Sequence, residues 1–156
     1  MRGQVSRLVV IDASVMQSAG ETEDSVSSAC RKALRVILRV CHRVATTDAI
    51  HDEWKSHMSR FARKWLCSMA AHRKPSERVN PVDVSVDTAE WSDPDRRVVE
   101  KDLHLIEAAL SADRIIVTRD DVFRRVLAKT LKGTRLLESI TWVNPVSDGI
   151  TQLETL

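Results

Sequence analysis

The sequence is poor in glycine, proline and cysteine, with four, four and three of them among 156 residues. So few glycines leave no glycine-rich loop of the kind that cradles phosphates or dinucleotides. Cys30, Cys41 and Cys67 form no C-x-x-C pair, which argues against a zinc knuckle and a redox pair. Cys30 and Cys41 fall in or beside a helical pattern, where a free thiol packs as a small hydrophobe. A reducing, cytoplasmic setting is the expectation.

Other familiar sites and signals are missing as well. No apolar run approaches the length of a membrane span, and the first residues do not follow a signal-peptide layout, so we expect no membrane association. No two histidines stand at i, i+4, and there is no G-x-S-x-G motif. These absences argue against helix-borne zinc hydrolases and serine hydrolases.

Charge is unevenly distributed along the chain. The formal net charge is only +2, but residues 31–78 sum to +8 and residues 79–121 to −6. A basic region facing an acidic one is what a polyanion-binding protein with a cation site needs. The alternative is ordinary scattered surface charge.

Apolar runs alternate with helical patterns. Residues 8–11 and 115–117 are continuous apolar runs typical of strands buried on both faces, as in parallel sheets. Shorter strands are predicted at 44–46 and 140–143. Helices are predicted over about 25–42, 48–71 (with Asp48 as N-cap), 94–111 and 121–131, the last ending near Gly133.

This alternation predicts an α/β fold, a three-layer sandwich with a mostly parallel central sheet. The chain has the length of one domain, residues 1–156. Residues 74–93 hold Pro75, Pro81 and an alternating run over 82–87. We expect an irregular excursion there, with an exposed strand within it.

Two acidic residues follow the two buried strands. Asp12 comes directly after the first, and Asp120 comes shortly after the second. In open α/β sheets, ligands bind beyond the carboxyl ends of the strands, so both carboxylates are candidates for a site there. The alternative is structural, with Asp120 or Asp121 capping the next helix and Asp12 capping a turn.

Two further acids lie on apolar helix faces. Asp102 stands three residues after Val99 and four before Ile106, so it shares their stripe. Glu53 lies beside Trp54 in the same way, whereas Asp52 falls on the polar side. A buried carboxylate is costly unless a cation or several donors meet it. The alternative is that each acid reaches water from the edge of its stripe.

Four clustered carboxylates would repel one another, and one or more would stay protonated at neutral pH. A divalent cation removes that conflict, and oxygen-only ligands favour Mg²⁺ or Mn²⁺. Such an ion polarises a phosphoryl oxygen and generates hydroxide from bound water. The four acids therefore predict metal-assisted hydrolysis of a phosphodiester.

The order of these motifs resembles the PIN domain, a nuclease fold used by VapC-type toxins and several RNA-processing enzymes. The matching elements are Val10-Ile11-Asp12-Ala13-Ser14, the turn Thr46-Thr47-Asp48 leading to Glu53, the helical run from Asp102 to Ala109, and Thr118-Arg119-Asp120. The similarity covers nearly the whole chain and is most specific from Asp102 to Phe123. The segment 74–93 is longer than a compact member of this family needs.

The resemblance implies a ribonuclease that cleaves single-stranded RNA with Mg²⁺ or Mn²⁺. Asp12, Asp102 and Asp120 would ligate the ion, and Glu53 would ligate it or help to position the water. Ser14 and Thr118 match hydroxyl positions that orient the acids. Asp121 would supplement the four acids. If the protein is a toxin, the resemblance further implies a small antitoxin protein and a homodimer.

Basic residues and one tryptophan are candidates for contacts with RNA. The basic candidates lie on the two predicted helices between residues 25 and 71 and beside Asp120, where they would attract phosphates or form ordinary solvated faces: Arg31, Lys32, Arg35, Arg39, Arg60, Arg63, Lys64 and Arg119. Trp54 and Trp65 fit a core stripe. Trp91, in the irregular segment, is a candidate for a nucleotide or partner contact.

Two other functions remain open. The first is a non-catalytic RNA-binding or assembly module of the same fold with a degenerate site, although all four acids are present. The second is a phosphoacceptor signalling domain. Such receivers place a pair of acids after the first strand, whereas Asp12 stands alone here.

Overall fold

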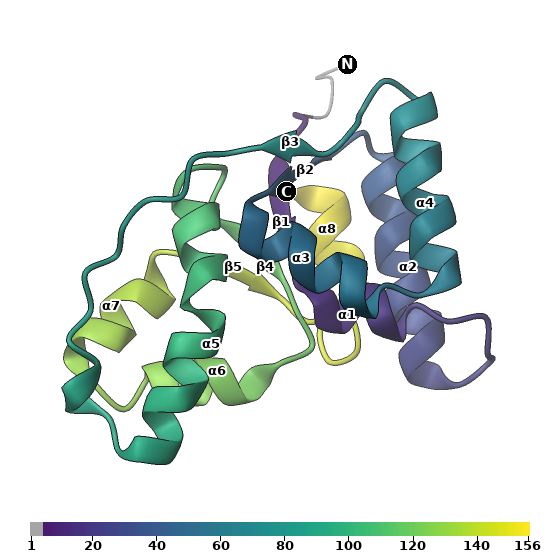
Figure 1. Ribbon diagram of the computed structural model, residues 1–156. Helices are drawn as coiled ribbons and strands as arrows, with labels where there is room; N and C mark the ends of the chain where they lie inside the picture. The colour runs from purple at the N-terminus through teal and green to yellow at the C-terminus, as the bar shows by residue number, and fades with distance from the viewer. Residues whose placement is uncertain (1–4) are drawn as a thin grey trace.

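A five-stranded, all-parallel sheet forms the centre of the computed structural model, which describes residues 5–156 (Figure 1). Residues 1–4 of the predicted domain lie outside the described residues. The strand order is β3-β2-β1-β4-β5. The strands are β1 (Leu8–Ile11), β2 (Arg43–Thr46), β3 (Glu77–Arg78), β4 (Ile115–Val117) and β5 (Thr141–Val143). The predicted α/β class is confirmed, and the sheet is wholly parallel.

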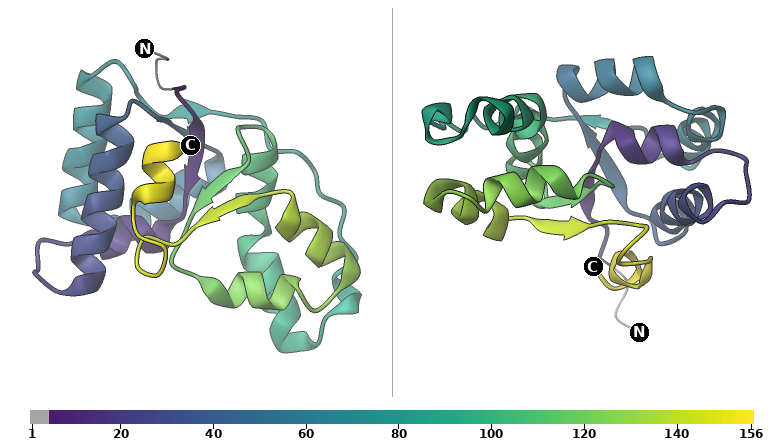
Figure 2. Two further views of the ribbon diagram at one scale, coloured as in Figure 1. Left: turned by 180° about the vertical axis from the view of Figure 1, so that it is seen from behind. Right: turned by 90° about the horizontal axis from the view of Figure 1, so that it is seen from below.

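Helices cover both faces of this sheet, giving three layers. In Figures 1 and 2, α2 and α4 lie on one side of the sheet, and α5, α6 and α7 lie on the other. The helices are α1 (Ala13–Ser18), α2 (Ser25–Arg39), α3 (Asp48–His57), α4 (Arg60–Ala71), α5 (Asp93–Leu110), α6 (Asp121–Leu127), α7 (Leu131–Glu138) and α8 (Thr151–Thr155), with a 3₁₀ turn η1 (Thr88–Glu90). No helix within residues 5–156 is both long and apolar enough to cross a membrane.

The two apolar runs form adjacent strands in the middle of the sheet. Val9, Val10 and Ile11 of β1 are fully buried, and so are the three residues of β4. Val10 pairs with Ile116 and Ile11 with Val117. Burial on both faces is the condition under which a strand reads as a continuous apolar run.

The chain changes direction in the sheet between β1 and β4. It runs outward from β1 to β2 and β3, then returns across the sheet to β4 and continues to β5. Loops leaving the carboxyl ends of β1 and β4 therefore diverge, and this divergence opens a crevice in parallel sheets. Asp12 and Thr118, the residues that directly follow these two strands, stand at this crevice.

The expectation of a single long helix over residues 48–71 is wrong, because the segment forms two helices, α3 and α4. Met58 has extended backbone angles, and Ser59 caps α4 by accepting a hydrogen bond from the Ala62 amide at 3.0 Å. Ser59 also donates to the Ala19 carbonyl at 2.7 Å, which ties the break to the end of α1. The cap of α3 is Thr47, not Asp48.

Residues 74–93 contain one short strand, as expected, but the alternating run over residues 82–87 is not part of it. The strand in this region is β3, which pairs with β2 at Ala45 and Thr46. The chain after β3 runs along α5 (Figure 1), where the amides of Val82 and Val84 donate to Glu107. The alternating run is thus held by α5 and, at Ser85, by Lys132 of α7 rather than by a neighbouring strand.

The helix expected over residues 121–131 is α6, which already ends at Leu127, and a further helix that was not expected, α7, begins at Leu131. Gly133, expected at a helix end, lies in the first turn of α7. A Cβ atom there would come within 2.1 Å of the Leu127 carbonyl oxygen, so only glycine allows the two helices to approach this closely.

Candidate active site

A cavity of about 280 Å³ opens at the carboxyl ends of β1 and β4. It brings together all four acids singled out from the sequence, together with residues of α1, α3 and α5. Its lining consists of Asp12, Ala13, Ser14, Gln17, Glu53, His57, Lys101, Asp102 and Asp120. Residues about 110 positions apart in the chain thus share one cavity.

Asp12 is buried and held by two hydroxyl groups. Its Oδ2 accepts hydrogen bonds from Ser14 Oγ at 2.7 Å and from Thr118 Oγ1 at 2.8 Å. The Asp12 amide donates to the Val117 carbonyl at 2.9 Å, which fixes its backbone to β4. Ser14 and Thr118 therefore orient the Asp12 carboxylate.

Asp102 is equally buried, with 6% of its surface exposed, but its surroundings oppose its charge. Burial, the nearby charges of Asp12 and Asp120 and a hydrogen bond with Asp120 raise the pKa of Asp102 to about 7, although the Lys101 ammonium acts in the other direction. The carboxyl of Asp102 is thus partly protonated at neutral pH. A cation bound in the cavity would lower the pKa of Asp102 and favour its charged form.

Asp120 both caps α6 and lines the cavity. Its Oδ1 caps α6 by accepting from the amides of Val122 at 2.9 Å and Phe123 at 3.4 Å. Its own amide donates to Thr118 Oγ1 at 3.0 Å. The same threonine hydroxyl thereby connects Asp120 to Asp12, so the ends of the two strands are joined through one side chain.

Glu53 reaches the cavity from α3 because that helix is anchored to β1. The indole of Trp54, its neighbour in the chain, donates to the Ile11 carbonyl at 2.9 Å, directly before Asp12. Glu53 Oε1 lies 3.5 Å from His104 Nε2 on α5. The side chain of Glu53 therefore lies between the cavity and the histidine.

His104 stands beside the site and was not singled out from the sequence. Its Nδ1 lies 2.9 Å from the Lys101 carbonyl, which can only accept, so Nδ1 carries a proton. Its Nε2 is buried and has no hydrogen-bond partner in the described part of the chain. The ion-pair distance to Glu53 is too long to serve as a hydrogen bond.

Lys101, Gln17 and His57 also line the cavity and were missed from the sequence. That Lys101 lines the cavity can be inferred from its place beside Asp102 only once the orientation of α5 is known. Gln17 lies on α1, a six-residue helix that no periodic pattern announced. His57 is the last residue of α3, and the break after it had not been expected.

The candidate ligands suit a hard divalent cation, but their carboxylates lie too far apart to share one ion. Every candidate ligand is a carboxylate, the ligand type that Mg²⁺ and Mn²⁺ prefer. Among residues 5–156, however, no three His, Cys, Asp or Glu side chains are arranged closely enough to hold a metal ion. Binding would therefore have to draw the carboxylates together, against the repulsion that already raises the pKa of Asp102.

Two of the other candidates have structural positions instead. Arg31 is largely buried and donates to the carbonyls of Gly20 and Thr22, so it braces the loop before α2. Trp91 is buried too, and its indole donates to the Val126 carbonyl at 2.9 Å, so it is a packing residue. Both look like surface residues in sequence because their partners are distant backbone carbonyls.

Asp121 does not line the cavity. Its carboxylate accepts from the Asn144 amide at 3.3 Å and lies 3.6 Å from Arg124. The remaining basic candidates are exposed. Arg35, with its guanidinium over the Phe61 ring, and Arg60, Arg63 and Lys64 belong to α2 and α4, and Arg119 donates to Ser18 beside the cavity.

Comparison of the chain with models of known protein families, with curated proteins and with solved structures finds no match. The function therefore has to be argued from the residues and the cavity alone.

Proposed function

We propose that this protein is a metal-dependent endoribonuclease of the PIN type. The observation that supports this best is the convergence of Asp12, Glu53, Asp102 and Asp120 in one cavity at the carboxyl ends of β1 and β4. Four carboxylates contributed by separate elements repel one another, and the raised pKa of Asp102 reflects this repulsion and the burial of its carboxyl. A site that binds cations explains why they are together.

Asp12, Asp102 and Asp120 would hold Mg²⁺ or Mn²⁺. The bound ion would supply a polarised phosphoryl oxygen and an activated water. Thr118 and Ser14 keep the Asp12 carboxylate in one orientation, and Thr118 also holds the backbone of Asp120. Glu53, at the side of the cavity, would ligate the ion or help to position the attacking water.

Positive charge around the cavity suits an anionic substrate. Lys101 lines it directly, and Arg119 stands at its edge. The exposed bases of α2 and α4 add a wider field that attracts phosphates from a distance. RNA is the substrate that the resemblance implies, and a small antitoxin protein and a homodimer are the partners to expect if the protein is a toxin.

A second candidate is a non-catalytic RNA-binding or assembly module. It is favoured by the finding that no three candidate ligands within residues 5–156 are already arranged as a metal site. In that case the acids would be retained for structure, and RNA would bind without being cut.

The test is cleavage of end-labelled single-stranded RNA with Mn²⁺, compared with Glu53→Gln and Asp52→Asn. Asp52 is the exposed neighbour of Glu53 and serves as the matched control. We expect cleavage by the native protein and Asp52→Asn, and strongly reduced cleavage by Glu53→Gln. RNA binding without cleavage under Mg²⁺ or Mn²⁺ would favour the binding module.

A further inference from the structure

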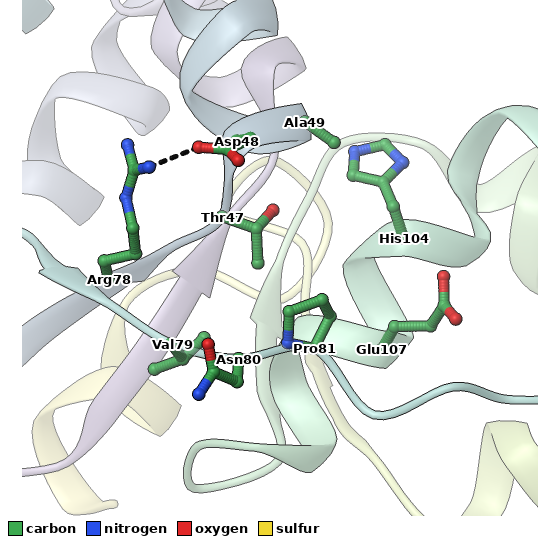
Figure 3. Close-up of a pocket in the computed structure, with 9 residues that line it drawn as sticks. All are labelled: Thr47, Asp48, Ala49, Arg78, Val79, Asn80, Pro81, His104 and Glu107. Atoms are coloured by element: carbon green, nitrogen blue, oxygen red, sulfur yellow. Dashed lines mark hydrogen bonds and ion pairs between the residues drawn. The ribbon is translucent and has the colours of Figure 1, made fainter.

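A second cavity, also of about 280 Å³, lies beyond the ends of β2 and β3. Figure 3 shows His104 and Ala49 on one side of it and the Pro81 ring opposite. Thr47 and Asn80 contribute polar groups, and the stem of Glu107 completes one wall. None of the four candidate catalytic acids lines this cavity.

The two cavities lie next to each other. Glu53 lines the first and His104 lines the second, and their side chains are 3.5 Å apart. Both cavities are also bordered by α3 and α5. A ligand that placed a phosphate among the acids would therefore have its adjoining group close to the second cavity.

The second cavity contains polar atoms whose bonding capacity is unused. His104 Nε2 is buried without a hydrogen-bond partner among the described residues. Thr47 Oγ1 accepts from the Ile50 amide at 3.3 Å, so its own hydrogen remains for another acceptor. Pro81, Val79 and Ala49 add apolar surface to the lining of this cavity.

The charges in the cavity argue against an anion. Asp48 and Glu107 both belong to its lining, and the Arg78 guanidinium is already paired with Asp48, as the dashed line in Figure 3 marks. A phosphate would meet two carboxylates with their one guanidinium engaged. An uncharged flat ring suits the walls better, since a base can stack on an imidazole and use polar atoms at its edge.

We propose that this second cavity binds an unstacked nucleobase of the RNA strand, next to the phosphate held at the acids. The inference rests on the proposed ribonuclease function, because that function supplies the RNA. Since a base is joined to its own phosphate through one ribose, adjacent cavities separated by Glu53 and His104 suit one nucleotide. His104 would then contact the base with a face of its ring, while the Nε2 edge of the ring borders Glu53.

The test fills the cavity without touching the acids. Ala49 is exposed in the first turn of α3, so Ala49→Leu puts bulk into the cavity, and Ala70→Leu makes the same change on exposed α4. Asn80→Leu is a second variant from the other wall, for use if Ala49→Leu does not fold. Thermal unfolding establishes that each variant is folded.

Binding is measured first, by fluorescence anisotropy of labelled single-stranded RNA with Ca²⁺ as the cation. We expect Ala49→Leu to weaken binding roughly tenfold, the size of one lost stacking contact, and Ala70→Leu to leave it unchanged. If Ala49→Leu binds RNA as tightly as the native protein, the base pocket is overturned. If Ala49→Leu does not fold, the same comparison is made with Asn80→Leu.

Cleavage with Mn²⁺ then locates the base. After the cut position is mapped, RNAs with an abasic ribose on either side of it are compared with the intact strand. We expect one of the two to raise KM about tenfold for the native protein but to have no further effect on Ala49→Leu. An equal response of both proteins to abasic RNA would contradict the inference while leaving the ribonuclease intact. Absence of any cleavage would overturn the ribonuclease instead, and the Ca²⁺ binding result would then decide the pocket alone.

Discussion

Asp12 and Asp102 face the same cavity at nearly the same burial, 7% and 6% exposed, but in opposite surroundings. Asp12, at the end of a strand, accepts hydrogen bonds from two hydroxyl groups. Asp102, in the middle of α5, has the charges of Asp12 and Asp120 beside it, and its pKa is raised to about 7. Asp12 is thus held by hydroxyl donors, whereas burial and neighbouring charges oppose the charged form of Asp102.

This difference indicates how one cavity can be both stable and ready for a cation. Hydroxyl donors let Asp12 remain oriented whether or not an ion is present. Asp102 is the part of the site that an added positive charge would change most, because its ionisation is the most hindered. Substitutions at the two positions should therefore agree for activity and differ for stability.

The largest expected effect is on cleavage. Asp12→Asn and Asp102→Asn should each abolish RNA cleavage with Mn²⁺, losing more than the roughly 10- to 100-fold that a partner outside the ligand sphere costs. Asp52→Asn is the control because its side chain is exposed outside the cavity lining. Native activity in either cavity mutant would reject the site.

The next effect separates the two acids by stability. Between pH 4 and about 7 the folded chain binds more protons at Asp102 than the unfolded chain does, so the free energy of unfolding falls as pH rises through this window. Asp102→Asn should therefore stabilise the protein at pH 8, by up to a few kcal/mol at about 1.4 kcal/mol per pKa unit, and much less at pH 4.

Asp12→Asn should give a smaller gain, because it removes only the Asp12 share of the repulsion at Asp102 and weakens the hydrogen bonds from Ser14 and Thr118. Urea unfolding at pH 4, 6 and 8 measures all three proteins. A gain of equal size in both mutants would mean that the surroundings of the two acids do not differ as described.

Cation binding should stabilise the native protein. Mn²⁺ at a hundredfold excess over its Kd should add about 2.7 kcal/mol to the free energy of unfolding, and chelation should reverse the gain. The gain should be larger at pH 8 than at pH 5, where protons compete for Asp102. Asp102→Asn should lose most of it and Asp52→Asn should retain it, and a thermal shift that is equal in both variants would place the ion elsewhere.

A smaller effect is expected from the hydroxyl that joins the strand ends. Thr118→Val removes the donor to Asp12 and the acceptor for the Asp120 amide, and should cost about 1 to 3 kcal/mol of stability. Cleavage should fall roughly 10- to 100-fold. Thr118→Ser keeps the hydroxyl and should restore most activity, whereas equal loss in both would point to packing of the methyl group.

The smallest effect is expected from the exposed basic side chains of α2 and α4, which do not line the cavity that holds Asp12 and Asp102. Arg63→Gln should weaken RNA binding by only a few-fold and lower the slope of log K against log salt by about 0.7 if it contacts one phosphate. Arg135→Gln, on α7 at the other side of the sheet, is the control. An unchanged slope for Arg63→Gln would remove it from the RNA path.

The two middle strands and the class of fold were predictable because burial on both faces leaves a continuous apolar run at Leu8–Ile11 and Ile115–Val117. The breaks were not. Met58 and Ser59 interrupt an apolar stripe that continues from α3 into α4, and the hydrogen bond from Ser59 to Ala19 that fixes the break comes from 40 residues away. Helical periodicity reports which face is buried, and contains no information on such distant partners.

The candidate site divides in the same way. Asp12, Glu53, Asp102 and Asp120 could be chosen because an acid at a strand end or on an apolar stripe breaks a local pattern. Arg31, Trp91 and Asp121 were misjudged because each meets a partner that no local pattern reveals. His104 and Lys101 became visible only when α5 was placed against α3.

The sequence by itself determined which segments must be buried and which carboxylates would be costly there, since both follow from the spacing of apolar residues along single elements. Tertiary structure alone decided that those carboxylates share one cavity, that Asp102 rather than Asp12 bears the strain of their charge, and that a second cavity adjoins them. The reason is physical: repulsion and hydrogen bonding depend on distances of a few ångströms between residues far apart in the chain.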